Sequence, residues 1–287
     1  MKHEIKKIVP GSPEYPPLLA ESRFALKELW ICGEANFRNE FCLAMVGTRS
    51  PSGLASSSVK EAVRMLKSNE VRIVSGLAQG VDSLCHLAAI ENSLPTTAVI
   101  AQGLDVPLQG SQKVLAEKIL EHGGNIISPF APGTKAFLSH FVKRNTIVSG
   151  MSNATLIVES RLKGGAMHTA RFCNKENKPL FAMPGNPLSE TSIGCNHLIY
   201  QKQASIVWST KELPEILGLN SLFKLSEPLP GLESACYLPE WAVKGTALQI
   251  GDICEQSQKS ISEVLADLTE LEMQGKCSVK NGEVIFY

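Results

Sequence analysis

The chain has 287 residues, of which 44% are hydrophobic, and its 28 Lys and Arg residues balance 28 Asp and Glu residues to a formal net charge of zero. This size suits one large α/β domain and a small second domain of an ordinary globular protein. We expect neither a membrane-spanning helix nor a secretory signal, because no apolar run approaches the roughly 18–20 residues needed to cross a bilayer and residues 1–19 lack an apolar core.

From about residue 41, short apolar runs typical of strands alternate with longer amphipathic segments typical of helices. The strands are predicted at 41–46, 71–75, 96–101, 125–128, 154–159, 179–184 and 205–208. The helices are predicted at 53–68, 78–92, 111–122, 137–150, 165–176 and 192–203. Most strand segments are continuously apolar, as in parallel sheets that are buried on both faces. The pattern predicts a doubly wound, Rossmann-like α/β sheet with its ligand site at the carboxyl ends of the strands.

The composition changes near the C-terminal end. Residues 226–240 are rich in Pro, Ser and Glu and are predicted to form a linker. Residues 261–276 carry an apolar stripe at helical spacing, and two β-type runs then flank Asn281-Gly282, a strong hairpin signal. Residues 241–287 are therefore predicted to form a small winged-helix domain.

Charge is distributed unevenly along the chain. Residues 1–225, the larger predicted domain with a lead-in at 1–40, carry 24 bases and 18 acids, a net of +6. Residues 226–287 carry four bases and ten acids, a net of −6. A polyanionic partner is therefore expected on the larger domain. Within it, the segment 135–175 has Glu159 as its one acid against seven bases, which are Lys135, Lys143, Arg144, Arg161, Lys163, Arg171 and Lys175.

The eight cysteines form no C-x-x-C pair, and most lie within apolar periodic segments. We interpret them as small buried hydrophobic side chains in a reducing cytoplasm rather than as disulfides or zinc ligands. No cofactor or metal ion is expected.

Three glycine-containing turns each connect a predicted strand to a predicted helix. In the first, Ser50 and Ser52 can cap the helix while Arg49 and backbone N–H groups face an anion. Any one of the turns is compatible with a simple tight connection, but all three should converge on one edge of the sheet, which favours a phosphate site. The turns are VGTRSPSG (46–53), SGLAQGVD (75–82) and GGAMHTA (164–170).

Several common sites are poorly supported. The turns match neither G-x-G-x-x-G nor G-x-x-x-x-G-K-[ST], and Glu70 precedes the second strand instead of following it, which argues against a dinucleotide site or a P-loop. Asp82 and His86 lie four residues apart on one helix and can pair, and we favour a contact that stiffens the glycine turn. Since His140 and His168 have no Ser or Cys partner in the sequence, nucleophilic catalysis is not indicated.

Residues 41–209 resemble the DNA-processing protein A family (DprA, also called Smf). The resemblance rests on VGTR (46–49), SGLAQGVDSLCHLAAI (75–90), GLD (103–105), APGT (131–134), HFVKRN (140–145), LIVES (156–160), FAMPGNP (181–187) and GCNHLI (194–199). Residues 14–35 also resemble the family's lead-in. The resemblance implies an extended Rossmann fold in a non-enzymatic protein of natural transformation. Such a protein binds and protects incoming single-stranded DNA, loads the recombinase RecA onto it, and forms a homodimer through the Rossmann domain.

The same resemblance implies a basic pocket for the strand. Arg49 would contact a phosphate, Phe141 would stack on a base, and Arg144 with Asn145 would hold the sugar-phosphate backbone. Ser75, Gly76 and Leu77 would offer backbone groups at a strand end, and Gly165, Met167 and Thr169 would contribute the third turn. The remaining implied site residues are Ser50, Lys135, Lys143 and Arg171.

Four positions depart from the family's pattern. Leu138 stands where a lysine often lies, and Thr146 replaces the second arginine of an R-N-R motif. Ala166 lies in a GGAM turn where the family has an SGSL-type turn, and Pro129 replaces an acid. The lost hydroxyl groups should weaken a phosphate site, whereas the lost acid should strengthen it, and nearby lysines can supply the charge missing at Leu138.

Two enzyme classes are the alternatives. A nucleotide phosphoribohydrolase of the lysine-decarboxylase-like type has a PGGxGTxxE turn, whereas KGGAMHTA and MPGNPLSE lack its ordered Gly-Thr and its acid. A NAD-dependent dehydrogenase would need the missing dinucleotide fingerprint.

The predicted winged helix is unsuited to reading a DNA duplex. Its candidate recognition helix has no base before Lys276, and its acids are Glu263, Asp267, Glu270 and Glu272. Because a major groove repels such a helix, we expect a protein-interaction or regulatory module.

Overall fold

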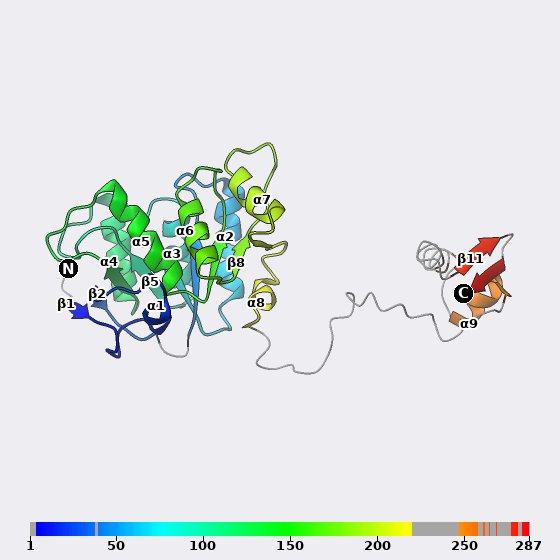
Figure 1. Ribbon diagram of the computed structural model, residues 1–287, viewed down its shortest axis with the longest axis horizontal. Helices are drawn as coiled ribbons and strands as arrows, with labels where there is room; N and C mark the ends of the chain where they lie inside the picture. Colours follow the sequence, from blue (N-terminus) through cyan, green and yellow to red (C-terminus); the bar gives the residue numbers. More distant parts are fainter. Residues whose placement is uncertain are drawn as a thin grey trace. The chain divides into compact units, whose positions relative to one another are not determined.

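The computed structural model describes residues 4–37, 40–219, 247–257, 261, 264, 268, 277–280 and 283–286. The chain divides into two compact units, Met1–Leu225 and Ser226–Tyr287 (Figure 1). Within these residues, no helix has the length and apolar character needed to cross a membrane.

A nine-stranded sheet forms the centre of the first unit. The strand order is β1-β2-β6-β5-β4-β3-β7-β8-β9. The strands from β3 to β9 pair in parallel, whereas β2 pairs antiparallel with both β1 and β6. The strands are β1 (Ile5–Ile8), β2 (Leu29–Gly33), β3 (Phe41–Val46), β4 (Val71–Ser75), β5 (Thr96–Val99), β6 (Asn125–Ser128), β7 (Ala154–Ile157), β8 (Leu180–Ala182) and β9 (Ser205–Ile206).

Helices cover both faces of this sheet and bury the apolar runs of its strands (Figure 1). One face carries α2 (Gly53–Met65), α3 (Val81–Glu91), α4 (Gly110–Glu121) and α8 (Leu213–Ile216). The other face carries α1 (Pro17–Glu21), α5 (Leu138–Gly150), α6 (Ala166–Lys175) and α7 (Ile193–Tyr200). The predicted doubly wound sheet is therefore confirmed, and all seven strands predicted after residue 40 form, with β5, β7, β8 and β9 shorter than predicted.

The lead-in at 1–40 contributes structure that the pattern did not predict. Strands β1 and β2 extend the sheet beyond β6, and α1 packs on the face that carries α5. The edge strand β1 has only four residues, and its Lys6 and Lys7 are exposed. At the other edge, β9 has two residues, both exposed. In β1 two lysines interrupt the apolar run, so the pattern gives no strand signal there.

Most cysteines pack as hydrophobic side chains, as predicted. Among the described residues, Cys254 is half-buried, and the buried cysteines are Cys32, Cys42, Cys85, Cys173, Cys195 and Cys277. Burial raises the pKa of the Cys195 thiol to about 12 and that of Cys42 to about 11, so both thiols stay protonated and unreactive at neutral pH.

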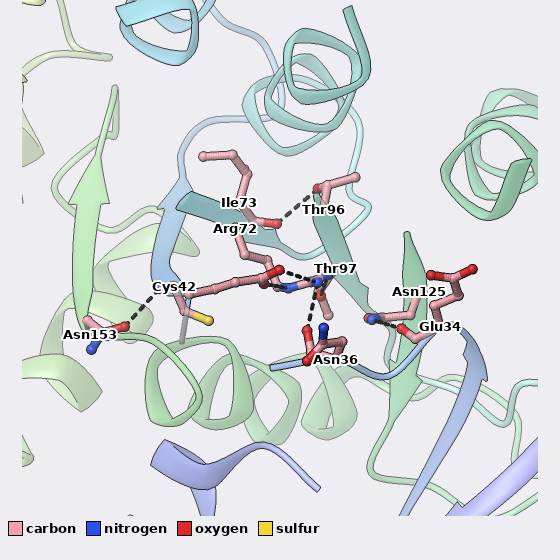
Figure 2. Close-up of polar contacts among 10 residues, drawn as sticks. Glu34, Asn36, Cys42, Arg72, Ile73, Thr96, Thr97, Asn125 and Asn153 are labelled. Atoms are coloured by element: carbon pink, nitrogen blue, oxygen red, sulfur yellow. Dashed lines mark hydrogen bonds and ion pairs between the residues drawn. The ribbon is translucent and has the colours of Figure 1, made fainter. Parts of the chain in front are cut away.

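A buried ion pair joins the lead-in to the amino ends of the parallel strands (Figure 2). Arg72 at the start of β4 is 3% exposed, and its Nε donates to Oε2 of Glu40 at 2.6 Å. The same guanidinium donates to the carbonyl of Asn36 at 2.8 Å and to Oγ1 of Thr97 on β5 at 3.3 Å. The Phe37 ring centroid lies 5.2 Å from its Cζ. One side chain thus connects the β2–β3 segment to two central strands.

Two further contacts in Figure 2 continue this connection across the sheet. The side-chain amide of Asn125 on β6 donates to the carbonyl of Glu34. The Oδ1 atom of Asn153, just before β7, accepts from the N–H of Cys42 on β3 at 2.7 Å. The amino ends of β3, β4, β5, β6 and β7 are therefore fixed by side chains, which leaves their carboxyl ends to form a site.

Among its described residues, the second unit contains a three-stranded antiparallel sheet in the order β10-β12-β11 and the helix α9 (Ile250–Ser257). The strands are β10 (Ala247–Gln249), β11 (Cys277–Lys280) and β12 (Glu283–Phe286). Ile253, Val264, Leu268, Cys277 and Val284 form its apolar core. The antiparallel pairing of β11 with β12 confirms the predicted hairpin strands. The predicted linker, most of the 261–276 helix and the Asn281-Gly282 turn lie outside the described residues, so the winged helix stays a prediction.

Removing one partner of the buried ion pair should destabilise the first unit. Arg72→Met removes the donor to Thr97 and to the carbonyl of Asn36 as well as the counter-charge of Glu40, and each buried acceptor left without a donor costs about 1–3 kcal/mol. We expect Arg72→Met to lower the free energy of unfolding by about 3 kcal/mol in urea denaturation. The double variant Arg72→Met/Glu40→Met should lose less than the two single losses added together.

Arg64→Met is the matched control, because Arg64 also pairs with a glutamate, Glu61, but on the exposed surface of α2. Its unfolding curve should match that of the wild type. An equal effect of the two arginine substitutions would show that burial of the Arg72 pair contributes nothing to the free energy of unfolding.

Candidate functional site

A cavity of about 290 Å³ opens where the strand order changes direction. From β3 the chain runs outward to β4, β5 and β6, and then crosses back to β7 on the other side of β3. Ligands of open α/β sheets bind at such switch points. The three glycine turns meet here, as predicted, together with one side of α5. The turns contribute Gly47, Thr48 and Arg49 after β3, Ala78 and Asp82 after β4, and Ser160, Arg161, Gly164 and Gly165 after β7.

The first two turns pack against each other so closely that glycine is required. A Cβ atom on Gly47 would lie 2.6 Å from Cγ2 of Val81 and 2.9 Å from the carbonyl oxygen of Glu159. Gly80 has a φ of +89°, and a Cβ there would overlap the carbonyl oxygen of Thr48. That carbonyl accepts from the N–H of Val81 at 3.1 Å. The wall of the cavity is therefore backbone, fixed by direct contact.

Glu159, the one acid of the segment 135–175, binds groups of the protein with both carboxylate oxygens. It is 5% exposed, and its Oε2 accepts from the N–H of Ser52 at 2.8 Å while its Oε1 accepts from the hydroxyl of Thr191 at 2.8 Å. Ser52 in turn caps α2, since its side chain accepts from the N–H of Ala55 at 3.1 Å. The carboxylate thus orients a helix start, and neither of its oxygens is left without a donor.

Arg144 brings a positive charge to the floor of the cavity. It is 5% exposed, and its Nη1 donates to the carbonyls of Gly76 at the end of β4 and Val99 at the end of β5, the latter at 2.9 Å. Asp82 is 6% exposed and accepts from the N–H of Gly76 at 3.1 Å. A Cβ on Gly76 would overlap the Arg144 guanidinium, which explains glycine at this position.

Burial opposes the charge on both members of this group. It raises the pKa of Asp82, against the stabilising charge of Arg144. It also lowers the pKa of Arg144, against the stabilising charge of Asp82, and the positive charge of Arg49 lowers it further. Because a buried arginine stays protonated at neutral pH, the cavity floor keeps a fixed positive charge.

Arg49 and Phe141 form the exposed rim. The Cζ atom of Arg49 lies 5.7 Å from the centroid of the half-buried Phe141 ring, within the range of a cation–π contact. Asn145, one turn further along α5, donates to the carbonyl of Gly165 at 3.5 Å. A cation beside an aromatic face can hold an anion and a planar ring at the same time.

The structure brings only some of the predicted site residues together. Those that line the cavity are Arg49, Phe141, Arg144, Asn145, Gly165 and Thr169. Outside the lining, Ser50, Lys135, Lys143 and Arg171 are exposed on the surface. Arg144 lines the cavity while its Nη1 donates to two carbonyls, and its contact with the sugar-phosphate backbone stays a prediction.

Four other predicted site residues belong to the framework. Ser75 is fully buried and donates to the carbonyl of Met45 at 2.7 Å. The Leu77 side chain packs in the core under α4, and its carbonyl accepts from the side-chain amide of Gln112 at 2.8 Å. Met167 packs in the core on the α5 face. Gly76 offers its backbone to Arg144 and Asp82, so these four residues support the cavity instead of lining it.

The favoured contact, one that stiffens the glycine turn, forms through Asp82, and Asp82 and His86 do not pair with each other. Both side chains are buried, but His86 Nδ1 lies 2.7 Å from Oγ1 of Thr96, whereas Asp82 accepts from the Gly76 N–H and so stiffens the glycine turn. The hydroxyl of Thr96 donates to the carbonyl of Ile73 at 2.9 Å, so His86 Nδ1 carries the proton and donates to Thr96. Two polar side chains in an otherwise apolar helix were the signal for burial.

The site also contains residues that the sequence reading missed, namely Thr48, Asp82, Ser160, Arg161 and Gly164. In the sequence, Arg161 adds to the positive charge of the segment 135–175, and Asp82 ends the glycine turn at 75–82. Within the described ranges, no three His, Cys, Asp or Glu side chains are grouped so that they could hold a metal ion.

The chain is similar to proteins of one family. The family model described as DNA recombination-mediator protein A matches residues 6–218. DNA processing protein DprA of Streptococcus pneumoniae is 36% identical over 174 residues, which cover 60% of this chain and 60% of that protein. Protein Smf of Escherichia coli is 29% identical over 283 residues, which cover 93% of this chain and 74% of that protein. The matched part is thus 60% of the length of the pneumococcal relative.

Two solved structures are similar to the fold. The X-ray structure of DprA from Streptococcus pneumoniae gives a TM-score of 0.68 at 32% identity, covering 74% of each chain. A structure of DNA processing protein A from Helicobacter pylori, described for its single-stranded DNA binding mode, gives a TM-score of 0.67 at 26% identity. It covers 76% of this chain and 98% of that chain.

Acid unfolding should report the buried His86. Burial, and next the charge of Arg144, lowers its pKa from 6.5 to about 3. Its contribution to stability is complete above pH 6.5 and is lost as the pH falls toward 3, because the unfolded chain binds the proton first. His86→Asn keeps a donor in place of Nδ1 but cannot be protonated. Relative to this variant, the wild type should lose up to about 1.4 kcal/mol of unfolding free energy per pH unit between pH 6 and 4.

The measurement is urea denaturation at a series of pH values. His122, the exposed C-cap residue of α4, supplies the control. The variant His122→Asn should keep the wild-type pH profile. Parallel profiles for wild type and His86→Asn would contradict the assignment of a neutral buried imidazole.

Proposed function

Because the chain belongs to the DNA recombination-mediator protein A family, we propose that it binds single-stranded DNA in the switch-point cavity. In the same proposal it protects incoming strands during natural transformation and loads the recombinase RecA onto them. It acts without catalysis, in the cytoplasm, as a homodimer joined through the Rossmann domain. Support comes from the family match and from the similarity to the Helicobacter pylori protein, whose structure concerns single-stranded DNA binding.

The Arg49–Phe141 pair is the observation that carries the proposal. Single strands are held by phosphate contacts and by stacking of bases on aromatic rings, with little reading of sequence. Arg49 can neutralise a phosphate while a base stacks on Phe141, whose ring lies 5.7 Å from the guanidinium carbon. Of the described residues that line the cavity, only Phe141 is aromatic, so charge should dominate the affinity.

The start of α6 is the second support. Gly165 is its N-cap, and no side chain caps the helix, in contrast to the start of α2, which Ser52 caps. The N–H groups of Met167 and His168 donate to the carbonyls of Gly164 and Gly165 at 3.1 Å each, and the positive end of the helix dipole favours an anion here. Arg161 is exposed at this end of the cavity, and its Nη1 lies 3.7 Å from Oε2 of the exposed Glu190, a weak surface pair that a second phosphate can replace. The fixed charge of Arg144, which lines the same cavity, attracts both phosphates.

The contacts of the two cavity acids favour binding over hydrolysis. A nucleotide phosphoribohydrolase would need a carboxylate free to act on water or sugar. Both oxygens of Glu159 accept hydrogen bonds from the protein, and Asp82 is buried with its carboxylate on the Gly76 N–H. Incubation with AMP or a cytokinin monophosphate should therefore release no base, and release of base would support the enzyme alternative.

The acidic second unit fits a protein partner better than DNA. Residues 226–287 carry four bases against ten acids, so the phosphates of a single strand or a duplex would be repelled. We assign it a protein-interaction or regulatory role.

Loss of the rim arginine should weaken single-strand binding in a salt-dependent manner. For wild type, anisotropy of labelled oligo-dT of about 35 nucleotides should show strong preference over the matching duplex. The slope of log K against log salt should be roughly −2 to −3 if three or four phosphates are neutralised. Arg49→Ala should reduce affinity about tenfold or more and make the slope shallower by about 0.7, the value for one phosphate contact on a single strand.

Arg64→Ala is the matched control, because Arg64 is an exposed arginine in the last turn of α2 and is not among the cavity residues. It should leave both affinity and slope unchanged. Equal binding to duplex, or an unchanged slope for Arg49→Ala, would count against the cavity as the DNA site.

Deletion of residues 226–287 should leave single-strand affinity within about threefold, because this acidic unit adds no phosphate contact. The same anisotropy assay, with circular dichroism to verify folding of the shortened chain, measures the change. A loss of tenfold or more would mean that the second unit binds DNA itself.

A further inference from the structure

Phe137 is an aromatic side chain that the cavity does not use. It is the N-cap residue of α5, and it is 62% exposed. Single exposed apolar side chains are common on protein surfaces and usually need no explanation. Phe137 differs because its ring is held in place.

A row of rings fixes the orientation of Phe137. The His140 ring stacks on Phe130 with centroids 4.0 Å apart and planes at 22°. The Phe137 ring meets His140 edge-on, with centroids 5.2 Å apart and planes at 86°. Phe130 is 8% exposed, so the row is anchored in the protein interior. A ring that is already immobile loses little conformational entropy when a ligand stacks on it.

The surroundings of Phe137 are positively charged. Lys135 is exposed two residues before it, and Nζ of Lys143 lies 5.2 Å from the centroid of Phe130. The sequence from 129 to 150 contains no Asp or Glu. An exposed aromatic face flanked by lysines suits a ligand with planar rings and negative charges, which describes a nucleic acid strand.

Phe137 is also continuous with the cavity. Phe141, four residues later, lines the cavity and faces Arg49. Phe137 has an extended backbone and directly precedes the first turn of α5, on which Phe141 lies. A strand that places one base on Phe141 would therefore pass Phe137 as it leaves the cavity along the start of α5.

We infer that Phe137 is a second base-stacking position, which binds the base of a nucleotide adjacent to those in the cavity, with Lys135 and Lys143 neutralising the flanking phosphates. This inference rests on the proposed single-strand binding. The cavity alone would hold a short oligonucleotide, and Phe137 would extend the site to a longer one.

Binding of oligo-dT of increasing length tests the inference. Phe137→Leu keeps an apolar side chain and removes the ring. It should leave the affinity for a strand of about four nucleotides unchanged and lower that for about eight nucleotides by fivefold to tenfold. Phe137→Trp should restore the affinity for the longer strand. Leu138→Ala is the matched control, because Leu138 is adjacent, 90% exposed and not aromatic, and it should have no effect.

A single abasic nucleotide moved along the longer strand identifies the stacked base. In the wild type, an abasic nucleotide at one position outside the cavity should lower the affinity about as much as Phe137→Leu does. In Phe137→Leu the same abasic position should cost nothing further, because the ring and the base act as a pair. Thermal unfolding of the variant should match the wild type, which would separate lost stacking from lost folding.

Four outcomes would overturn the inference. Equal abasic costs in wild type and Phe137→Leu would show that no base stacks there. If Phe137→Leu keeps its affinity while Arg49→Ala loses binding, the stacking role of Phe137 is rejected and the proposed function stands. If the wild type binds no single strand, both the inference and the proposed function are rejected. A changed oligomeric state in both Phe137→Leu and Leu138→Ala, without a change in DNA affinity, would identify the patch as a protein contact.

Discussion

The buried guanidinium of Arg144 is the contact on which the site depends. A charge removed from water is very costly unless protein dipoles and a counter-charge replace the lost hydration. Here the carbonyls that end β4 and β5 supply the dipoles and Asp82 supplies the counter-charge. Gly76 must lack a side chain because the guanidinium occupies that volume. Strand ends, glycine turn and helix α5 are thus positioned by the requirements of one side chain.

This arrangement also determines the electrostatics of the cavity. The nearby acids bind groups of the protein itself: Asp82 faces Arg144 and the Gly76 N–H, and Glu159 accepts from Ser52 and Thr191. Arg49 and Arg161 remain exposed on the rim. A cavity built with neutralised acids and exposed bases attracts anions of many shapes. Such a site is selective for charge and stacking and carries little information about sequence.

The sequence predicted the central fold well and the site less completely. Continuous apolar runs such as FCLAMV located the parallel strands, and the glycine turns predicted where the strand ends would meet. Periodicity cannot reveal which neighbour satisfies a buried polar group, so Arg144 in HFVKRN resembled an exposed residue of an amphipathic helix. Likewise, Leu77 and Met167 belong to motifs whose other residues line the cavity, but their own side chains pack in the core. Such choices depend on tertiary neighbours, which local patterns do not contain.

The two edges of the nine-stranded sheet have a consequence for assembly. Unpaired edge strands are templates for another chain, and natural proteins protect them by keeping them short or charged. Both devices occur here, since β1 has four residues with Lys6 and Lys7 exposed and β9 has only two residues. The edge strands of two copies of this protein therefore offer almost no backbone groups for hydrogen bonds between the copies. If they associate through the Rossmann domain, side-chain packing between preformed surfaces must hold them together, and each sheet must stay separate.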